Sequence, residues 1–283
     1  SGCSSKTSLM SVTVVLQCAL PMLRLLLRQQ MPNRSFKRPT CASKTTGLIR
    51  IQHSTYDLCG KIIVAIKPEE IAGLEALYQR GIQNGLSGLR FLNKDEIKQY
   101  EPNCTGIKGV FVPQTGIVDY KQIAVKLAEN INNNPNGKIV LNSKITAIVG
   151  NEHGAVVHSD DERYEARLVI NCAGLYCDKV AAMAGEKLNM QIIPFRGEYY
   201  SIKPEKAHLV KNLIYPVPDP NFPFLGVHFT RMIQGGVEAG PNAVMAFGRE
   251  AYTKTQINWK ELGETLAWPG FRKVALKYWQ TGI

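Results

Sequence analysis

The sequence predicts an α/β (α+β) protein in which a βαβ portion is joined to a portion built on a mixed or antiparallel sheet. Arg167–Gly174 joins a continuous apolar run, typical of a buried parallel strand, to an Ala-Gly turn that opens onto a helix. Such a small-residue turn lets the backbone approach a ligand closely. After Ile192 the pattern changes to aromatic-containing strands separated by proline-rich loops, which favours an antiparallel sheet.

Length and charge limit the possible functions. The chain has 283 residues, enough for two domains of ordinary size, and a net charge of +11. Eight basic residues precede Asp57, the first acidic residue, and residues 57–283 hold 26 basic against 23 acidic residues. The folded part therefore lacks the strong basic excess of a nucleic-acid-binding protein, and we expect no nucleic-acid partner.

The seven cysteines are scattered and include no C-x-x-C pair, which favours a reducing compartment. Cys172 and Cys177 could be combined with His153 and His158, but their spacing matches no structural zinc pattern. We therefore predict no metal site.

Residues 1–56 differ in composition from the rest of the chain. They are rich in Ser, Arg and Leu, contain no acid, and include an apolar and basic stretch over 16–31 that Pro21 interrupts. This composition is typical of a mitochondrial transit peptide, and the stretch is too short and too charged for a membrane span. The alternative is a segment that is not native coding sequence, because no strand-turn-helix order is evident. Both interpretations stay open.

From residue 57 to 193, strands and helices alternate. We expect strands at 61–66, 106–112, 138–141, 144–149, 155–159 and 167–171. Helices are expected from Pro68 to near Gly81, within 93–101 after a capping box, from Asp119 as N-cap, and from Gly174 to about Ala184. This is the βαβ order of a nucleotide-binding domain.

The last third of the chain is expected to contain strands at 198–203, 224–230 and 243–247, a proline-rich loop over 215–220, and two helices around Trp268.

Several side chains in this last third are candidates for chemistry. Arg196 and Arg231 stand beside glycine, aromatic or proline residues, as arginines that bind carboxylates in a cleft often do. His228 lies in an apolar strand and is a candidate base. Surface ion pairs for the arginines and a structural role for His228 remain open alternatives. No G-x-G-x-x-G motif is present, although a dinucleotide-binding enzyme would be expected to carry one.

Seven blocks, in order, carry a resemblance to a known family. They are Cys59–Ala65, Thr115–Tyr120, Val169–Tyr176, Ile193–Tyr199, Ile214–Asp219, Phe222–Arg231 and Gly240–Val244. From Tyr56 onward the chain resembles the L-2-hydroxyglutarate dehydrogenases, flavoproteins of the D-amino-acid-oxidase-like superfamily. The block around Phe224–Phe229 separates this family from glycine and sarcosine oxidases.

The resemblance implies an FAD cofactor and a split layout. The implied divisions are a leader-like or non-native segment (1–56), a substrate domain in two parts (57–115 and 194–283), and the middle portion of a Rossmann-like FAD-binding domain (116–193). Cofactor contacts are implied for the turn Cys172, Ala173 and Gly174, and for the strand holding Ile145.

The implied reaction is oxidation of L-2-hydroxyglutarate, a small dicarboxylate 2-hydroxy acid, to 2-oxoglutarate, with electrons leaving to a membrane acceptor. The implied substrate-binding residues are Arg196, Tyr215, His228 and Arg231, with His228 and Arg196 as the catalytic pair.

Family members begin with G-x-G-x-x-G and end with a glycine-rich flavin segment, so we expect this chain to match the middle of such an enzyme. We expect a mitochondrial location, with inner-membrane association as the finer expectation. A non-catalytic fragment and a glycine- or sarcosine-type oxidase remain alternatives, and the oligomeric state is not predicted.

Overall fold

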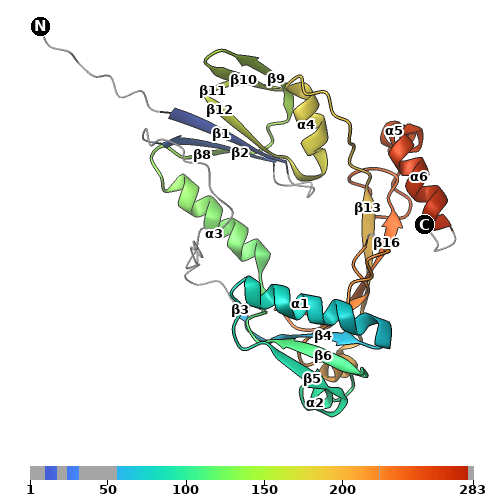
Figure 1. Ribbon diagram of the computed structural model, residues 1–283. Helices are drawn as coiled ribbons and strands as arrows, with labels where there is room; N and C mark the ends of the chain where they lie inside the picture. Colours follow the sequence, from blue (N-terminus) through green and yellow to red (C-terminus); the bar gives the residue numbers. More distant parts are fainter. Residues whose placement is uncertain (1–9, 18–23, 32–55, 223, 280–283) are drawn as a thin grey trace, which may run out of the picture. The chain divides into compact units, whose positions relative to one another are not determined.

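The computed structural model describes residues 10–17, 24–31, 56–222 and 224–279 (Figure 1). These residues form helices and strands in both parts of the chain, which confirms the predicted α/β class. The chain divides into two compact units, one formed by residues 1–51, 124–194 and 246–282, the other by residues 52–123 and 195–245 with Ile283. We call them unit 1 and unit 2. Residues 246–282 cluster with 124–194 in unit 1.

Unit 1 contains a four-stranded sheet in the order β12-β1-β2-β8 and a three-stranded sheet in the order β11-β10-β9. The strands of the first sheet are β1 (Met10–Gln17), β2 (Arg24–Met31), β8 (Lys138–Val140) and β12 (Leu168–Cys172). Those of the second are β9 (Ile145–Asn151), β10 (Gly154–Ser159) and β11 (Arg163–Ala166). In the first sheet β1 pairs parallel with β12 and antiparallel with β2.

Strands β1 and β2 correct one sequence-based expectation. No strand-turn-helix order is evident in residues 1–56 from sequence alone, yet residues 10–17 and 24–31 are strands in register with β12 and β8. The Val and Thr residues of β1 favour this conformation because β-branched side chains suit a pleated surface. The rest of the leader-like segment lies outside the described residues.

The core of unit 1 lies between the three-stranded sheet and α4 (Cys177–Met183). Its buried members are Ile145, Ile148, Val157, Tyr164, Ala173 and Val180. The short helix η2 (Gly174–Tyr176) links β12 to α4, and α5 (Trp259–Ala267) and α6 (Pro269–Tyr278) complete the unit.

Unit 2 is built on a seven-stranded mixed sheet in the order β13-β16-β15-β14-β4-β6-β5. The strands are β4 (Lys61–Ala65), β5 (Arg90–Asn93), β6 (Lys108–Val112), β13 (Phe195–Ser201), β14 (Leu213–Pro216), β15 (His228–Arg231) and β16 (Val237–Met245). All neighbours are antiparallel except β14 and β4, which run parallel. A separate pair is formed by β3 (Tyr56–Asp57) and β7 (Ile117–Val118).

Two helices cover opposite faces of this sheet near β4 and β6. α1 (Ile71–Gln83), preceded by η1 (Pro68–Glu70), packs Leu74 against Ala65 and Val110. α2 (Lys94–Tyr100) packs Ile97 against Ile62 on the other face. The helix η3 (Pro204–Leu209) follows β13. α3 (Tyr120–Asn132) begins in unit 2 and continues into unit 1.

Some predicted boundaries in unit 2 are wrong. The expected loop over 215–220 begins with β14, where Pro216 ends a strand and so removes no central ladder hydrogen bond. The strand expected at 224–230 starts only at His228, and the one expected at 243–247 spans Val237–Met245. Residue propensities do not predict that strand, because it contains Gly240 and Pro241 and both residue types are depleted in strands. Gly240 is required there, since a Cβ atom would lie 2.9 Å from the Glu198 carbonyl oxygen.

Within the described part of the chain, no helix is both long and apolar enough to cross a bilayer. The described residues also contain no cluster of three or more His, Cys, Asp or Glu side chains arranged to hold a metal ion.

Candidate functional site

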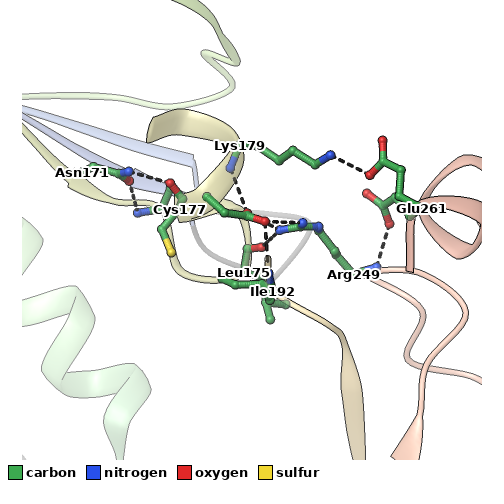
Figure 2. Close-up of polar contacts among 10 residues, drawn as sticks. Asn171, Leu175, Cys177, Lys179, Ile192, Arg249 and Glu261 are labelled. Carbon is green, nitrogen blue, oxygen red and sulfur yellow. Dashed lines mark hydrogen bonds and ion pairs between the residues drawn. The ribbon is translucent and has the colours of Figure 1, made fainter. Parts of the chain in front are cut away.

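The small-residue turn after β12 is fixed from within by Asn171. The Asn171 Oδ1 atom accepts a hydrogen bond from the Ala173 backbone N–H at 3.1 Å, and its Nδ2 donates to the Cys177 carbonyl at 2.8 Å (Figure 2). Gly174 follows with φ of +55°, a left-handed conformation that glycine adopts without steric cost. The turn is therefore locked in a shape that ordinary side chains would oppose.

The predicted cofactor residues lie around this turn in different environments. Cys172 is exposed, Ala173 is fully buried, and Gly174 has no side chain. Ile145 is buried in the core of unit 1 with Ala173, so only its main chain is available to a ligand. A turn at the carboxyl end of a parallel strand, with small residues and an accessible backbone, fits a ligand that contacts the main chain, such as a dinucleotide.

A buried ion pair fastens the segment that follows the turn. Arg249 donates through Nη1 to Asp178 Oδ1 at 2.5 Å and through Nη2 to Asp178 Oδ2 at 2.7 Å. The two side chains are only 2% and 8% exposed. Arg249 Nη1 also donates to the Leu175 carbonyl, directly after Gly174 (Figure 2). Sequence reasoning missed this pair because its partners are 71 residues apart.

Neighbouring contacts complete this arrangement, which we call the Asp178 clasp. Asp178 also accepts backbone hydrogen bonds from Lys179 at 2.8 Å and Ile192 at 3.1 Å. The Arg249 backbone N–H donates to Glu261 Oε2 at 2.7 Å (Figure 2). Burial raises the pKa of Asp178, but the hydrogen bonds from Arg249 and from the two backbone amides outweigh it, and the pKa lies below its ordinary value.

In unit 2, Tyr215 and His228 lie side by side on neighbouring strands. Their rings stack with centroids 4.1 Å apart, and His228 is only 6% exposed. The His228 Nδ1 atom lies 3.0 Å from the Gly226 carbonyl oxygen. Because a carbonyl oxygen can only accept, Nδ1 carries the proton, and in the neutral ring Nε2 holds the free lone pair. This is the arrangement that a base requires.

The two predicted arginines are not brought to this pair. Arg196 pairs with Val244 of β16 and His228 pairs with Gly240, and the pairing of β13 with β16 is irregular between Glu198 and Tyr200. Arg196 lies on β13, two strands from β15 in the sheet, and its guanidinium pairs with Glu198 at 2.7 Å. Arg231 projects from the opposite face, because its spacing from His228 along β15 is odd.

Arg231 has partners of its own on that opposite face. Its Nη1 atom donates to the Lys211 carbonyl at 2.9 Å and lies 3.3 Å from Asp57 Oδ2. Sequence reasoning placed Arg231 with His228 because they share a short motif, but alternation within the strand separates them.

The face of the sheet that carries α2 also holds a mainly apolar cavity of about 490 Å³. Val64, Ile214 and Phe229 line it from adjacent strands, and Leu209 and Lys206 line it from η3. Tyr215 also borders this cavity. The His228 ring projects from the other face of the sheet, and His228 does not line the cavity.

A buried carboxylate also fixes the entry to β14. Glu101 is fully buried and accepts hydrogen bonds from the Lys211 backbone at 3.0 Å, the Asn212 backbone, and Asn212 Nδ2 at 2.8 Å. This contact positions the strand that carries Tyr215.

Comparison with known proteins is informative for this arrangement. The profile of a family described as FAD dependent oxidoreductase matches residues 45–280. The L-2-hydroxyglutarate dehydrogenase of Indibacter alkaliphilus is 52% identical over 253 residues, which cover 88% of this chain and 63% of that protein. The mitochondrial L-2-hydroxyglutarate dehydrogenase of Nematostella vectensis is 42% identical over 242 residues, covering 81% and 53%. The chain thus spans less than two thirds of the length of either relative.

Among solved structures, a similar fold occurs in the dithionite-reduced L-alpha-glycerophosphate oxidase of Mycoplasma pneumoniae, a structure with FAD bound. The TM-score is 0.55 at 24% sequence identity, and the match covers 71% of this chain and 53% of that one. At this identity the likeness establishes the fold alone.

Proposed function

The chain belongs to the FAD-dependent oxidoreductase family, and from this premise we propose that it oxidises L-2-hydroxyglutarate to 2-oxoglutarate with FAD as cofactor. The names of the two relatives, at 52% and 42% identity, support this substrate. Within unit 2, the observation that carries the proposal is His228, a buried imidazole whose Nδ1 is held by the Gly226 carbonyl and whose Nε2 is left as an acceptor.

In this proposal the turn of Cys172, Ala173 and Gly174 would hold FAD, mainly through its backbone. Bound FAD would supply a two-electron acceptor for the hydrogen that leaves C2 of the substrate together with its electron pair. The Asp178 clasp keeps the end of the turn in place, because it holds the Leu175 carbonyl directly after Gly174.

His228 Nε2 takes the proton of the C2 hydroxyl as the alcohol becomes a ketone. The Gly226 carbonyl stabilises the imidazolium that results, because both ring nitrogens then carry protons and Nδ1–H keeps its acceptor. Tyr215 stacks on the ring, holds its plane, and offers a hydroxyl donor beside it. Arg196 and Arg231 remain predictions as substrate-binding cations, to be tested by replacing each with Ala and measuring turnover and KM.

The cofactor and the substrate are tested in sequence. The purified chain is incubated with FAD, gel-filtered, and examined for flavin absorbance, and L-2-hydroxyglutarate, glycine or sarcosine is then added without oxygen. We expect bound flavin whose absorbance is bleached by L-2-hydroxyglutarate and by neither amine. Bleaching by glycine or sarcosine alone would indicate the amine-oxidase alternative, and failure to hold flavin would indicate a non-catalytic fragment.

The mitochondrial name of the Nematostella relative supports a mitochondrial location, although a bacterial relative is also similar. Fractionation of the source cells with antibodies to the chain tests this proposal. The same membrane and soluble fractions, supplied with L-2-hydroxyglutarate and a dye acceptor, test the proposed membrane electron acceptor.

A further inference from the structure

A third polar side chain shares the sheet face of Tyr215 and His228. Tyr215 pairs with Ile63 across the parallel strands β14 and β4. Lys61 lies two residues before Ile63, so its side chain projects from the same face of β4. β14 lies between β4 and β15 in the sheet. Lys61 and His228 therefore flank Tyr215 from its two neighbouring strands.

Two measured contacts fix the spacing of this row. The Lys61 ammonium lies 4.9 Å from the centroid of the Tyr215 ring, and that centroid lies 4.1 Å from the centroid of the His228 ring. Taken end to end, these distances place the ammonium at most about 9 Å from the imidazole centroid. A cation and a base are thus held apart by a single aromatic ring.

The Lys61 ammonium has an environment suited to an anion. Its residue is half-buried, and burial lowers its pKa. Among the described residues, no carboxylate forms an ion pair with it. A partly desolvated ammonium gains more from a carboxylate than an exposed one does, because water competes less well for the charge.

We propose that Lys61 binds the distal carboxylate of the dicarboxylate substrate and so determines the preference for a 2-hydroxy acid with a second acid group. This inference rests on the proposed function, with the C2 hydroxyl at His228. In an extended five-carbon chain, about 6 Å separates that hydroxyl from the far carboxylate at standard bond lengths. With a hydrogen bond of about 2.8 Å at each end, the extended chain reaches about 11–12 Å, more than the gap of at most about 9 Å, so a bent chain contacts both the imidazole and the ammonium.

The other cations of this sheet supply the comparison. Arg231 projects from the opposite face and is engaged with Asp57 and the Lys211 carbonyl. Arg196 lies on β13, two strands from β15, and is paired with Glu198. Lys61 is therefore the cation that directly flanks the Tyr215–His228 pair.

The test uses the FAD-loaded chain with Lys61→Met, Lys61→Arg and, as the matched control, Lys108→Met, because Lys108 belongs to the same sheet and is paired with Glu75. Each is assayed with L-2-hydroxyglutarate and with L-2-hydroxybutyrate, which ends in a methyl group. We expect Lys61→Met to raise KM for the dicarboxylate roughly 10- to 100-fold, the worth of a charged hydrogen bond, with a smaller change in kcat. KM for the monocarboxylate should stay unchanged, and Lys61→Arg should recover much of the loss. Equal effects of Lys61→Met on both substrates, or a larger effect of Lys108→Met, would overturn the proposal.

A binding measurement separates this inference from the proposed reaction. Calorimetric titration of 2-oxoglutarate into each protein should give a dissociation constant roughly 10- to 100-fold weaker for Lys61→Met than for the wild type and for Lys108→Met. If the wild type binds 2-oxoglutarate through Lys61 but oxidises nothing, the reaction is wrong and the Lys61 site stands. If binding does not depend on Lys61, the Lys61 site is wrong whatever the activity.

Discussion

At the scale of single residues, the Asp178 carboxylate determines how the segment after the small-residue turn is held. Four donors converge on it, two from the Arg249 guanidinium and two from backbone amides. The charges of Asp178 and Arg249 compensate each other, and removing either side chain would leave the other charged, buried and without a partner. The pair therefore restricts the position of the turn more than it adds net stability.

Removing the arginine alone should be costly. We expect Arg249→Met to lower the free energy of unfolding of unit 1 by about 3–5 kcal/mol, because it leaves Asp178 charged and buried. The double variant Arg249→Met with Asp178→Leu should regain much of that loss. Lys179→Met, which removes the partly exposed pair with Glu264 at 2.6 Å, is the control and should cost about 1 kcal/mol or less. Urea unfolding measures the free energy of unfolding of the wild type and the three variants. A loss for Arg249→Met no larger than the loss for Lys179→Met would contradict the role of the Asp178 clasp.

The same carboxylate predicts a dependence of stability on pH. The pKa of Asp178 is lowered in the folded state, and its unfolded value is about 3.9. The folded state therefore binds its proton less readily, and the stabilisation is complete above about pH 4 and lost as the pH falls through the lower folded pKa. Asp178→Asn should flatten the fall of unfolding free energy below about pH 4 in acid titrations. If the unfolding free energy of Asp178→Asn falls with pH as steeply as that of the wild type, other carboxylates cause the fall.

At the scale of elements, local features could be predicted and long-range ones could not. The capping box of α2 is evident because Asn93 and Glu96 bond each other's backbone within one turn, and Asp119 caps α3 in the same way at 2.9 Å. β14 escapes prediction because its four residues become a strand only by pairing with β4, which lies about 150 positions earlier in the chain.

In the candidate site, too, contacts between distant parts of the chain could not be predicted from the sequence. Sequence reasoning found Tyr215 and His228, which the structure stacks. It missed Lys61, although the block Cys59–Ala65 contains it, because only the sheet order places this lysine beside Tyr215. The separation of Arg231 from His228 was within reach, since an odd spacing in a strand puts two side chains on opposite faces.

Replacing Glu101 tests whether a residue distant in sequence holds β14 in place. Glu101→Ala should leave the amides of Lys211 and Asn212 without their acceptor, at about 1–3 kcal/mol for each group. Hydrogen exchange at these two amides and along β14 should accelerate in the variant, while exchange in α4 should not change. Glu101→Gln keeps one acceptor oxygen and should show a smaller effect. Uniform acceleration across both units would indicate general destabilisation in place of a local anchor.

At the scale of the whole molecule, the two proposed ligands belong to different units. The turn of Cys172–Gly174 lies in unit 1, whereas Lys61, Tyr215 and His228 lie in unit 2. Each unit has its own buried core, so each is expected to respond to its own ligand. Ligand binding stabilises the unit that contains the site by mass action, by about 2.7 kcal/mol at one hundred times Kd.

FAD and 2-oxoglutarate should therefore protect different parts of the chain. Hydrogen exchange with FAD should slow amide exchange in residues 168–183 and leave 213–216 and 228–231 little changed, because the dinucleotide contacts the turn after β12. With 2-oxoglutarate added as well, exchange should slow in β4, β14 and β15. The Lys61→Met protein should lose the second response and keep the first, since Lys61 is remote in sequence from the turn and belongs to unit 2. Protection by FAD confined to unit 2 would contradict the assignment of the cofactor turn, and a dicarboxylate response that survives in Lys61→Met would contradict that of the substrate cation.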